Sequence, residues 1–197
     1  MHIRDQKAAL RVSIKERMAK MRPGDRVSES RSLCKYLLEL LPKEPSTICG
    51  YIPLADEVDV LPALKTLLER GWQIYLPCFD GKKLVFRQTA DLTTLHRGTL
   101  NIAEPPTDAP MLDPNTVSHV LVPGRAFTRD GKRLGRGNGG YDHWIHAQRT
   151  SKPDATVWGI AYECQLVNEV PWEEHDEAVD SVITARETYG TALEPVS

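Results

Sequence analysis

The chain has 197 residues, of which 41% are hydrophobic and 26% are charged, close to the averages of globular proteins. These values exclude a disordered or fibrous protein, and the length suits a single domain, which we expect to span residues 1–197. The 25 basic and 27 acidic residues leave a formal net charge of −2, so the chain as a whole has no attraction for nucleic acid or a membrane surface.

The cysteines and the apolar runs indicate the compartment. The four cysteines are widely separated and none forms a C-x-x-C pair, which predicts reduced thiols rather than disulfides or a structural zinc site. No apolar run approaches the roughly 20 residues that cross a bilayer, and the amino terminus has no apolar signal core. We therefore expect a cytoplasmic monomer that has neither a membrane nor a nucleic acid as its partner.

Two helices are predicted at the amino terminus. Over residues 5–21, apolar side chains recur at every fourth position from Leu10 to Met18, the spacing of an amphipathic helix. A second helix fits residues 25–41, where a leucine-rich stripe ends just before Pro42.

Strands and helices then alternate. Residues 46–53 are apolar and partly β-branched, which predicts a buried strand, and residues 60–70 have a helical pattern. The same patterns predict strands at residues 72–77, 83–88, 118–123, 156–161 and 179–184, and a helix at residues 141–149. Proline-rich residues 101–115 read as a surface connection, and the tail from Glu187 as loose. This alternation is typical of an α/β protein with a parallel sheet.

A basic, glycine-rich stretch is the strongest chemical signal. The 19 residues from Gly124 to Asp142 hold six glycines, five basic residues and two acidic ones. Glycines let the backbone approach an anion, and a helix beginning near Tyr141 would add free amides and a favourable dipole. Arg133 and Arg136 could supply charge-assisted hydrogen bonds, and Asp142 could hold a Mg²⁺ carried by phosphates. The simpler alternative is a surface turn.

Two familiar phosphate motifs do not fit this stretch. Gly135, Gly137 and Gly140 form a G-x-G-x-x-G pattern, but no clear strand directly precedes it and no acid follows at a distance of about 20 residues. The P-loop spacing also fails, so a phosphate site here would be of another type.

Charged residues elsewhere have structural alternatives. Asp56 and Glu57 follow a strand, at the sheet edge where α/β proteins place ligands, although Asp56 could simply cap the next helix. The acidic run over residues 173–177 is by default a solvated surface. Lys7 and Arg11 share one helix face, which would ordinarily be a basic stripe in solvent.

Five motifs occur in order along nearly the whole chain. They are K-x-x-L-R at Lys7 to Arg11, D-E-V at Asp56 to Val58, N-I-x-E-P at Asn101 to Pro105, V-P-G-x-A-F…G-x-R-L-G-x-G-x-G-x-Y-D at Val122 to Asp142, and Q-L-V…V-P…H-D…V-D-x-V-I-T at Gln165 to Thr184. With these motifs the chain resembles the 5-formyltetrahydrofolate cyclo-ligase (methenyltetrahydrofolate synthetase) family.

The resemblance implies a fold and a reaction. The fold would be a three-layer α/β/α domain with a largely parallel central sheet. The reaction would convert 5-formyltetrahydrofolate into 5,10-methenyltetrahydrofolate, with Mg²⁺ present and with ATP consumed to ADP and phosphate. The formyl oxygen would take the γ-phosphoryl group before the folate N10 closes the ring. Such chemistry needs positioning and charge neutralisation more than a protein nucleophile.

The resemblance also implies roles for individual residues. Arg136 and Tyr141 would be catalytic, and Asp142 and Asp176 would hold Mg²⁺. ATP would be bound by Lys7, Arg11, Arg133, Leu134, Gly135, Arg136, Gly137, Asn138, Gly139, Gly140 and Tyr141. The reduced folate would be bound by Ile52, Glu57, Arg136, Gly137, Asn138, Gly139 and Gly140.

The chain departs from the family pattern at three positions. The family usually has two aromatic residues before the aspartate of the loop, whereas this chain has Gly140 followed by Tyr141. Arg125 and Thr128 also differ from the usual residues. Two alternatives therefore stay open: a relative that acts on another formylated amine, and an anion- or RNA-binding module that uses the arginine-rich loop.

Overall fold

The computed structural model describes residues 2–81, 83–98 and 102–190. A seven-stranded sheet runs through its centre in the order β11-β10-β9-β6-β1-β2-β3. The strands are β1 (Thr47–Cys49), β2 (Gln73–Asp80), β3 (Lys83–Thr89), β6 (His119–Pro123), β9 (Thr156–Ile160), β10 (Ser181–Ile183) and β11 (Thr188–Gly190). All neighbours from β2 to β10 are parallel, and the two edge strands β3 and β11 are antiparallel. The predicted largely parallel sheet is confirmed.

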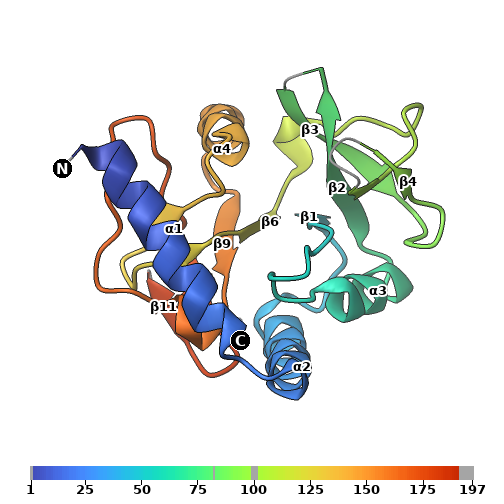
Figure 1. Cartoon of the computed structure of the whole chain (residues 1–197). Coiled ribbons are helices and arrows are strands. Elements are labelled where there is room, and N and C mark those ends of the chain that lie inside the picture. The colour runs from blue at the N-terminus through green and yellow to red at the C-terminus, as the bar shows by residue number, and fades with distance from the viewer. Residues whose placement is uncertain (1, 82, 99–101, 191–197) are drawn as a thin grey trace.

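Helices cover both faces of this sheet (Figure 1). They are α1 (Ile3–Ala19), α2 (Pro23–Leu40), α3 (Leu61–Glu69) and α4 (Gly140–Ser151). In Figure 1, α4 lies above the sheet and α2 and α3 lie below it. The three-layer α/β/α arrangement is therefore confirmed.

Alternation along β6 explains why both faces are covered. Leu121 belongs to the buried cluster that includes Ile14, Leu37 and Leu64 from α1, α2 and α3. Its neighbour Val120 belongs to the second cluster, beside residues of α4. Successive side chains on a strand point to opposite faces, so a continuous apolar strand needs a helical layer on each side.

Short elements complete the fold. Two small hairpins are formed by β4 (His96–Arg97) with β5 (Ala103–Glu104) and by β7 (Ala126–Phe127) with β8 (Arg133–Leu134). Two 3₁₀ helices span Pro114–Thr116 and Glu163–Gln165. All four cysteines are free thiols, as predicted. Within the part of the chain that the structure describes, no helix is long and apolar enough to cross a membrane.

The structure corrects three sequence interpretations. The strand predicted at residues 46–53 is only β1, because the chain turns away from the sheet after Gly50. The tail predicted to be loose from Glu187 instead forms β11, which pairs with β10; residues 191–197 lie outside the described residues. The connection predicted at residues 101–115 contains β5 and a 3₁₀ helix, and Asn101 itself is not among the described residues.

Candidate active site

The glycine-rich loop joins β8 to α4. Gly137 and Gly139 have φ angles of +107° and +67°, in the left-handed region that favours glycine. Gly139 is the N-cap of α4, so the turn at Gly139 aims the free amides of the first helical turn at the loop. Sequence reasoning missed the strand β8 directly before the loop. Because β8 belongs to a separate hairpin and not to the central sheet, the loop still differs from a dinucleotide fingerprint.

A pocket of about 150 Å³ opens beside this loop. The predicted site residues that line it are Ile52, Glu57, Arg133, Gly135, Arg136, Asn138, Gly139, Gly140, Tyr141 and Asp142. Sequence reasoning missed the other lining residues, which are Tyr51, Leu54, Pro77, Phe79, Leu84, Ile102, Glu104, Pro123 and Gly124. The E-P motif could have indicated Glu104, which lines the pocket and is almost fully buried.

Five predicted site residues do not line the pocket: Lys7, Arg11, Leu134, Gly137 and Asp176. The Arg11 guanidinium donates from Nε to the Gly135 carbonyl at 2.9 Å. A β-carbon placed on Gly137 would meet the same guanidinium at 3.4 Å. Burial, and then the positive charge of Arg125, lower the pKa of Arg11. Leu134 is 1% exposed, so its side chain packs in the core.

Arg133 and Asp142 form a buried ion pair at the pocket wall. The guanidinium donates to Asp142 Oδ1 at 2.6 Å, and the Glu177 amide donates to the same oxygen at 3.3 Å. The Arg133 side chain is 2% exposed. Its buried Nε–H has no acceptor among the residues that the structure describes. An unused donor on a buried cation is suited to an anion entering the pocket.

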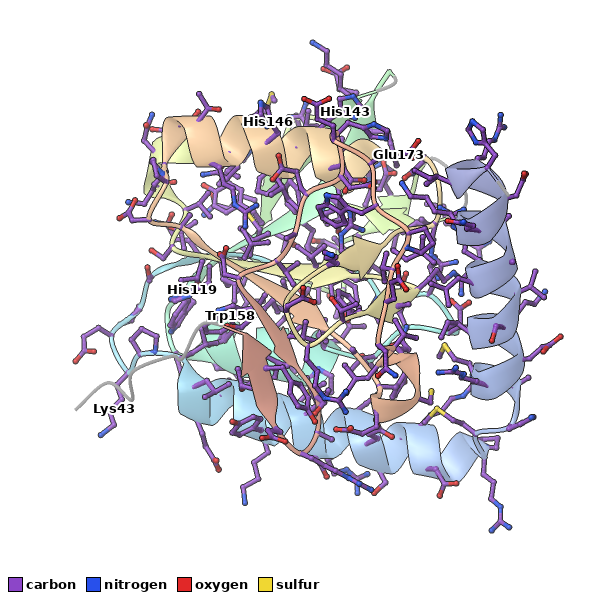
Figure 2. The ribbon with its side chains drawn as sticks, turned by 90° about the vertical axis from the view of Figure 1, so that its left-hand side faces the viewer. Lys43, His119, His143, His146, Trp158 and Glu173 are labelled. Carbon is purple, nitrogen blue, oxygen red and sulfur yellow. The ribbon has the colours of Figure 1, made fainter. Side chains whose placement is uncertain are left out.

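Lys7 lies between two acidic residues of the run that the sequence indicated as a solvated surface. Its ammonium contacts Glu173 at 2.7 Å and Asp176 at 2.7 Å. Burial opposes the charge of Lys7, but hydrogen bonds to Asp176 and Glu173 outweigh burial and raise its pKa. Figure 2 shows Glu173 in the space between α4 and α1, on the segment that leads from the 3₁₀ helix Glu163–Gln165 to β10. The solvated-surface interpretation is therefore wrong for Glu173 and Asp176.

Glu57 and Asp56 face the loop from the segment that follows β1. Arg136 donates from Nε to Glu57 Oε1 at 2.9 Å, and the Leu54 amide donates to the other carboxylate oxygen at 3.0 Å. Asp56 accepts hydrogen bonds from both Arg136 and Arg125. Burial opposes the charge of Asp56, yet the two guanidiniums more than offset burial and lower its pKa. Arg125, which departs from the family pattern, is thus a partner of Asp56.

Tyr141 is held at the start of α4. Its ring packs edge-on against Phe86, with ring centroids 6.4 Å apart, and the Arg133 guanidinium lies 5.8 Å from the ring centroid. Burial, together with the nearby Glu57 carboxylate, raises the pKa of the Tyr141 hydroxyl well above its ordinary value. The phenol therefore stays protonated at neutral pH and serves as a hydrogen-bond donor rather than a base.

Asp142 and Asp176 do not form a ready-made metal cluster. Within residues 2–81, 83–98 and 102–190, no group of three or more histidine, cysteine or acidic side chains is placed to hold an ion. A magnesium ion that arrives on phosphates needs only one or two protein carboxylates. The donor chemistry of these two residues fits that requirement.

Known proteins resemble this chain over most of its length. The model of the 5-formyltetrahydrofolate cyclo-ligase family matches residues 3–185. The 5-formyltetrahydrofolate cyclo-ligase of Mycolicibacterium smegmatis is 32% identical over 71% of this chain and 74% of its own. That of Escherichia coli K12 is 32% identical over 70% of this chain and 77% of its own. The 5,10-methenyltetrahydrofolate synthetase of Aquifex aeolicus superposes with a TM-score of 0.80 at 27% identity, over 95% and 96% of the two chains. The chain therefore belongs to the 5-formyltetrahydrofolate cyclo-ligase family of enzymes.

Proposed function

We propose that the protein uses Mg²⁺ and ATP to convert 5-formyltetrahydrofolate into 5,10-methenyltetrahydrofolate, releasing ADP and phosphate. The observation that carries this proposal is a single pocket where the buried Arg133, the first turn of α4 and the Glu57 carboxylate converge. The first two favour phosphate and the third favours an N–H-rich ring, so one pocket can bring a phosphoryl donor and a pterin together.

Phosphate groups would bind at the loop. Arg133 offers its unused Nε–H, and the first turn of α4 offers backbone amides and the positive end of the helix dipole. Lys7 and Arg11 would approach from α1, Arg11 through the loop that it already contacts. Leu134 and Gly137 would contribute through their backbone, because the Leu134 side chain is in the core.

The pterin head would bind opposite the phosphates. A carboxylate can accept two N–H groups from an aminopyrimidinone edge, and Glu57 is already oriented by Leu54 and Arg136. Ile52 and the loop from Arg136 to Gly140 would pack against the ring. Arg136 must exchange part of its ion pair with Glu57 for the incoming substrate.

Asp142 and Asp176 would hold the magnesium ion. When bound, the ion would neutralise charge on the ATP phosphates. Both carboxylates are paired with cations in the structure, Asp142 with Arg133 and Asp176 with Lys7. These cations would turn toward the phosphates as the nucleotide enters. The two carboxylates would then be neutralised by the metal ion instead of by Arg133 and Lys7.

The ring closure takes place in two balanced steps. The formyl oxygen bonds to the γ-phosphorus while the bond to ADP breaks. The N10 lone pair then bonds to the formyl carbon, the carbon–oxygen bond breaks, phosphate leaves with that oxygen, and N10 loses its proton. Arg136 would stabilise charge on the transferred group, and the protonated Tyr141 would donate a hydrogen bond to its oxygens.

The charge pattern disfavours the RNA-binding alternative. Three of the five basic residues in the glycine-rich stretch, Arg125, Arg133 and Arg136, are ion-paired with carboxylates. A fourth, Arg129, lies over the ring of Tyr189 at 5.2 Å. Nucleic-acid affinity depends on unneutralised cations that replace counterions, and three of these five cations already have carboxylate partners within the protein.

A direct assay tests the proposal. Purified protein is mixed with 5-formyltetrahydrofolate, and methenyltetrahydrofolate absorbance is followed with and without Mg²⁺ and ATP. We expect product only when both are present, with one ADP released for each product formed. Absence of product, with ATP binding retained, would favour another formylated amine as substrate.

A further inference from the structure

Arg125 lies in the turn between β6 and β7, outside the wall of the pocket. Its backbone is fixed from two sides: its amide donates to the Leu134 carbonyl at 2.7 Å, and its carbonyl accepts from Gln165 Nε2 at 3.2 Å. Gln165 is 1% exposed and also donates to the Gly124 carbonyl at 2.8 Å. The Arg125 side chain therefore extends from a rigid base toward the segment after β1, where its guanidinium contacts Asp56.

Four charged residues alternate in sign from this turn to the pocket. The Arg125 guanidinium donates to Asp56 Oδ2, and Asp56 Oδ1 accepts from Arg136 Nη2. Arg136 Nε then donates to Glu57 Oε1 at 2.9 Å. Of the four residues, Arg136 and Glu57 line the pocket, whereas Arg125 and Asp56 lie behind them. Arg125 and Asp56 therefore reach the contents of the pocket through Arg136.

The two carboxylate oxygens of Asp56 are divided between two guanidiniums. A carboxylate with both oxygens available can take a single arginine in a bidentate fork. Because Arg125 occupies Oδ2, Asp56 offers Arg136 only Oδ1, and the Nε edge of Arg136 stays on Glu57 at the pocket. The Asp56 side chain is 31% exposed, so without Arg125 it has room to rotate, to take Arg136 with both oxygens and to draw it away from Glu57.

We propose that Arg125 is a positioning residue: by occupying one oxygen of Asp56, it makes Asp56 a pivot for Arg136 during turnover. The inference rests on the proposed function. When the pterin takes Glu57, Arg136 gives up its Nε contact but keeps Asp56 Oδ1, so its charge is not left unpaired. The guanidinium then turns about that contact toward the phosphoryl group. Its Nη1, which makes no hydrogen bond within the described residues, is available as a donor to that group.

Replacing Arg125 tests the pivot by kinetics. In Arg125→Leu we expect kcat to fall at least about tenfold while the KM values for ATP and 5-formyltetrahydrofolate change less than about twofold, because the lost interaction acts on the transferred group. Arg125→Lys should keep kcat within about threefold, since a contact to one oxygen needs only one charged donor. Arg129→Leu, at an exposed arginine of the same glycine-rich stretch, is the matched control. A thermal melt verifies the folding of each variant.

A double-mutant cycle tests whether Arg125 acts through Asp56. The cycle consists of Arg125→Leu, Asp56→Asn and the variant that carries both substitutions. If Asp56 transmits the effect of Arg125, the double variant should have the same kcat as Asp56→Asn alone. A double variant whose loss in kcat is the product of the two single losses would overturn the pivot.

A spectroscopic measurement keeps the inference separable from the proposed function. The Nε–H signal of Arg136, assigned by its absence in Arg136→Lys, is followed by ¹⁵N NMR in the free protein, where no turnover is needed. In Arg125→Leu we expect this signal to shift and its exchange with water to rise at least about threefold, because the bond to Glu57 is lost. In Arg129→Leu the signal should be unchanged.

The two readouts have distinct outcomes. Lack of turnover in the unmodified protein, with the Arg136 signal shifted in Arg125→Leu, would overturn the proposed function and leave the pivot standing. An unchanged Arg136 signal in Arg125→Leu would overturn the pivot. So would an unchanged kcat in Arg125→Leu when the unmodified protein is active.

Discussion

The Arg133 guanidinium reaches across the glycine-rich loop and contacts Asp142, nine residues later, at 2.6 Å. The ion pair connects β8 to the first turn of α4, so it holds the two ends of the loop together beside the pocket. Because Arg133 is almost fully buried, Asp142 has two roles: it neutralises that charge in the resting protein, and by our proposal it meets the metal when a nucleotide binds.

Replacing Asp142 tests the second role. Asp142→Asn keeps the shape and one acceptor oxygen, so we expect the protein to fold but to lose at least about tenfold in kcat at saturating Mg²⁺. Asp154→Asn, at an exposed aspartate beyond α4, is the control and should behave like the unmodified enzyme. Steady-state assays across a Mg²⁺ titration provide the measurement, with a thermal melt to verify folding. Unchanged kcat at saturating Mg²⁺ would exclude the metal role.

Arg11 is expected to act on the nucleotide. Its guanidinium supports the loop through Gly135 and lies against Gly137, on the side of the loop that faces α1. In Arg11→Ala we expect the KM for ATP to rise roughly tenfold, and more than the KM for the folate, because the loop amides lose their support. Lys15→Ala, an exposed position on the same helix, is the matched control. A change in the folate KM alone would show that the assignment is wrong.

Tyr141 is expected to donate a hydrogen bond rather than to accept a proton. Burial raises the pKa of its hydroxyl well above the ordinary value, so the phenol does not ionise over the working range of pH. Tyr141→Phe should therefore lower kcat by about tenfold to a hundredfold while leaving the shape of the pH–rate profile unchanged. The profiles of the two proteins are compared under single-turnover conditions. Loss of a basic limb in the variant would mean that Tyr141 titrates during turnover.

Much of the fold follows from local patterns. The spacing from Leu10 to Met18 predicts α1, and the apolar runs predict β6 and β9, because helical and strand periods are properties of the nearby sequence. β8 and β11 could not be predicted in this way, because a segment of two or three residues is too short to show a period. Each of these two segments is a strand because it pairs with a neighbouring strand.

The candidate site also has a part that the local sequence predicts and a part that it does not. The loop from Gly135 to Asp142 could be predicted from residue types alone, because glycines and cations together indicate an anion. The contacts that organise it could not: Asp56 meets Arg125 across 69 positions, and Lys7 meets Asp176 across 169. Pairings over such separations are decided by the strand order of the sheet, which no local pattern encodes.

A buried histidine distant from the pocket is expected to make the stability of the protein depend on pH. His119 packs between Trp72 and Trp158, with ring centroids 5.8 and 5.0 Å away, and its Nδ1 lies 2.7 Å from Thr156 Oγ1 (Figure 2). Burial lowers the pKa of His119 to about 4. Between that value and the ordinary pKa of about 6.5, the unfolded chain binds a proton that the folded protein does not.

The free energy of unfolding should therefore fall as the pH falls from about 6.5 toward about 4, with a contribution from His119 of up to about 3 kcal/mol. His119→Gln retains a polar side chain near Thr156 but cannot titrate, so it should lose this part of the pH dependence even if it is less stable at every pH. Urea denaturation of both proteins at several pH values within that range provides the measurement. Parallel curves for the two proteins would show that folding does not lower the pKa of His119 and that another group carries the effect.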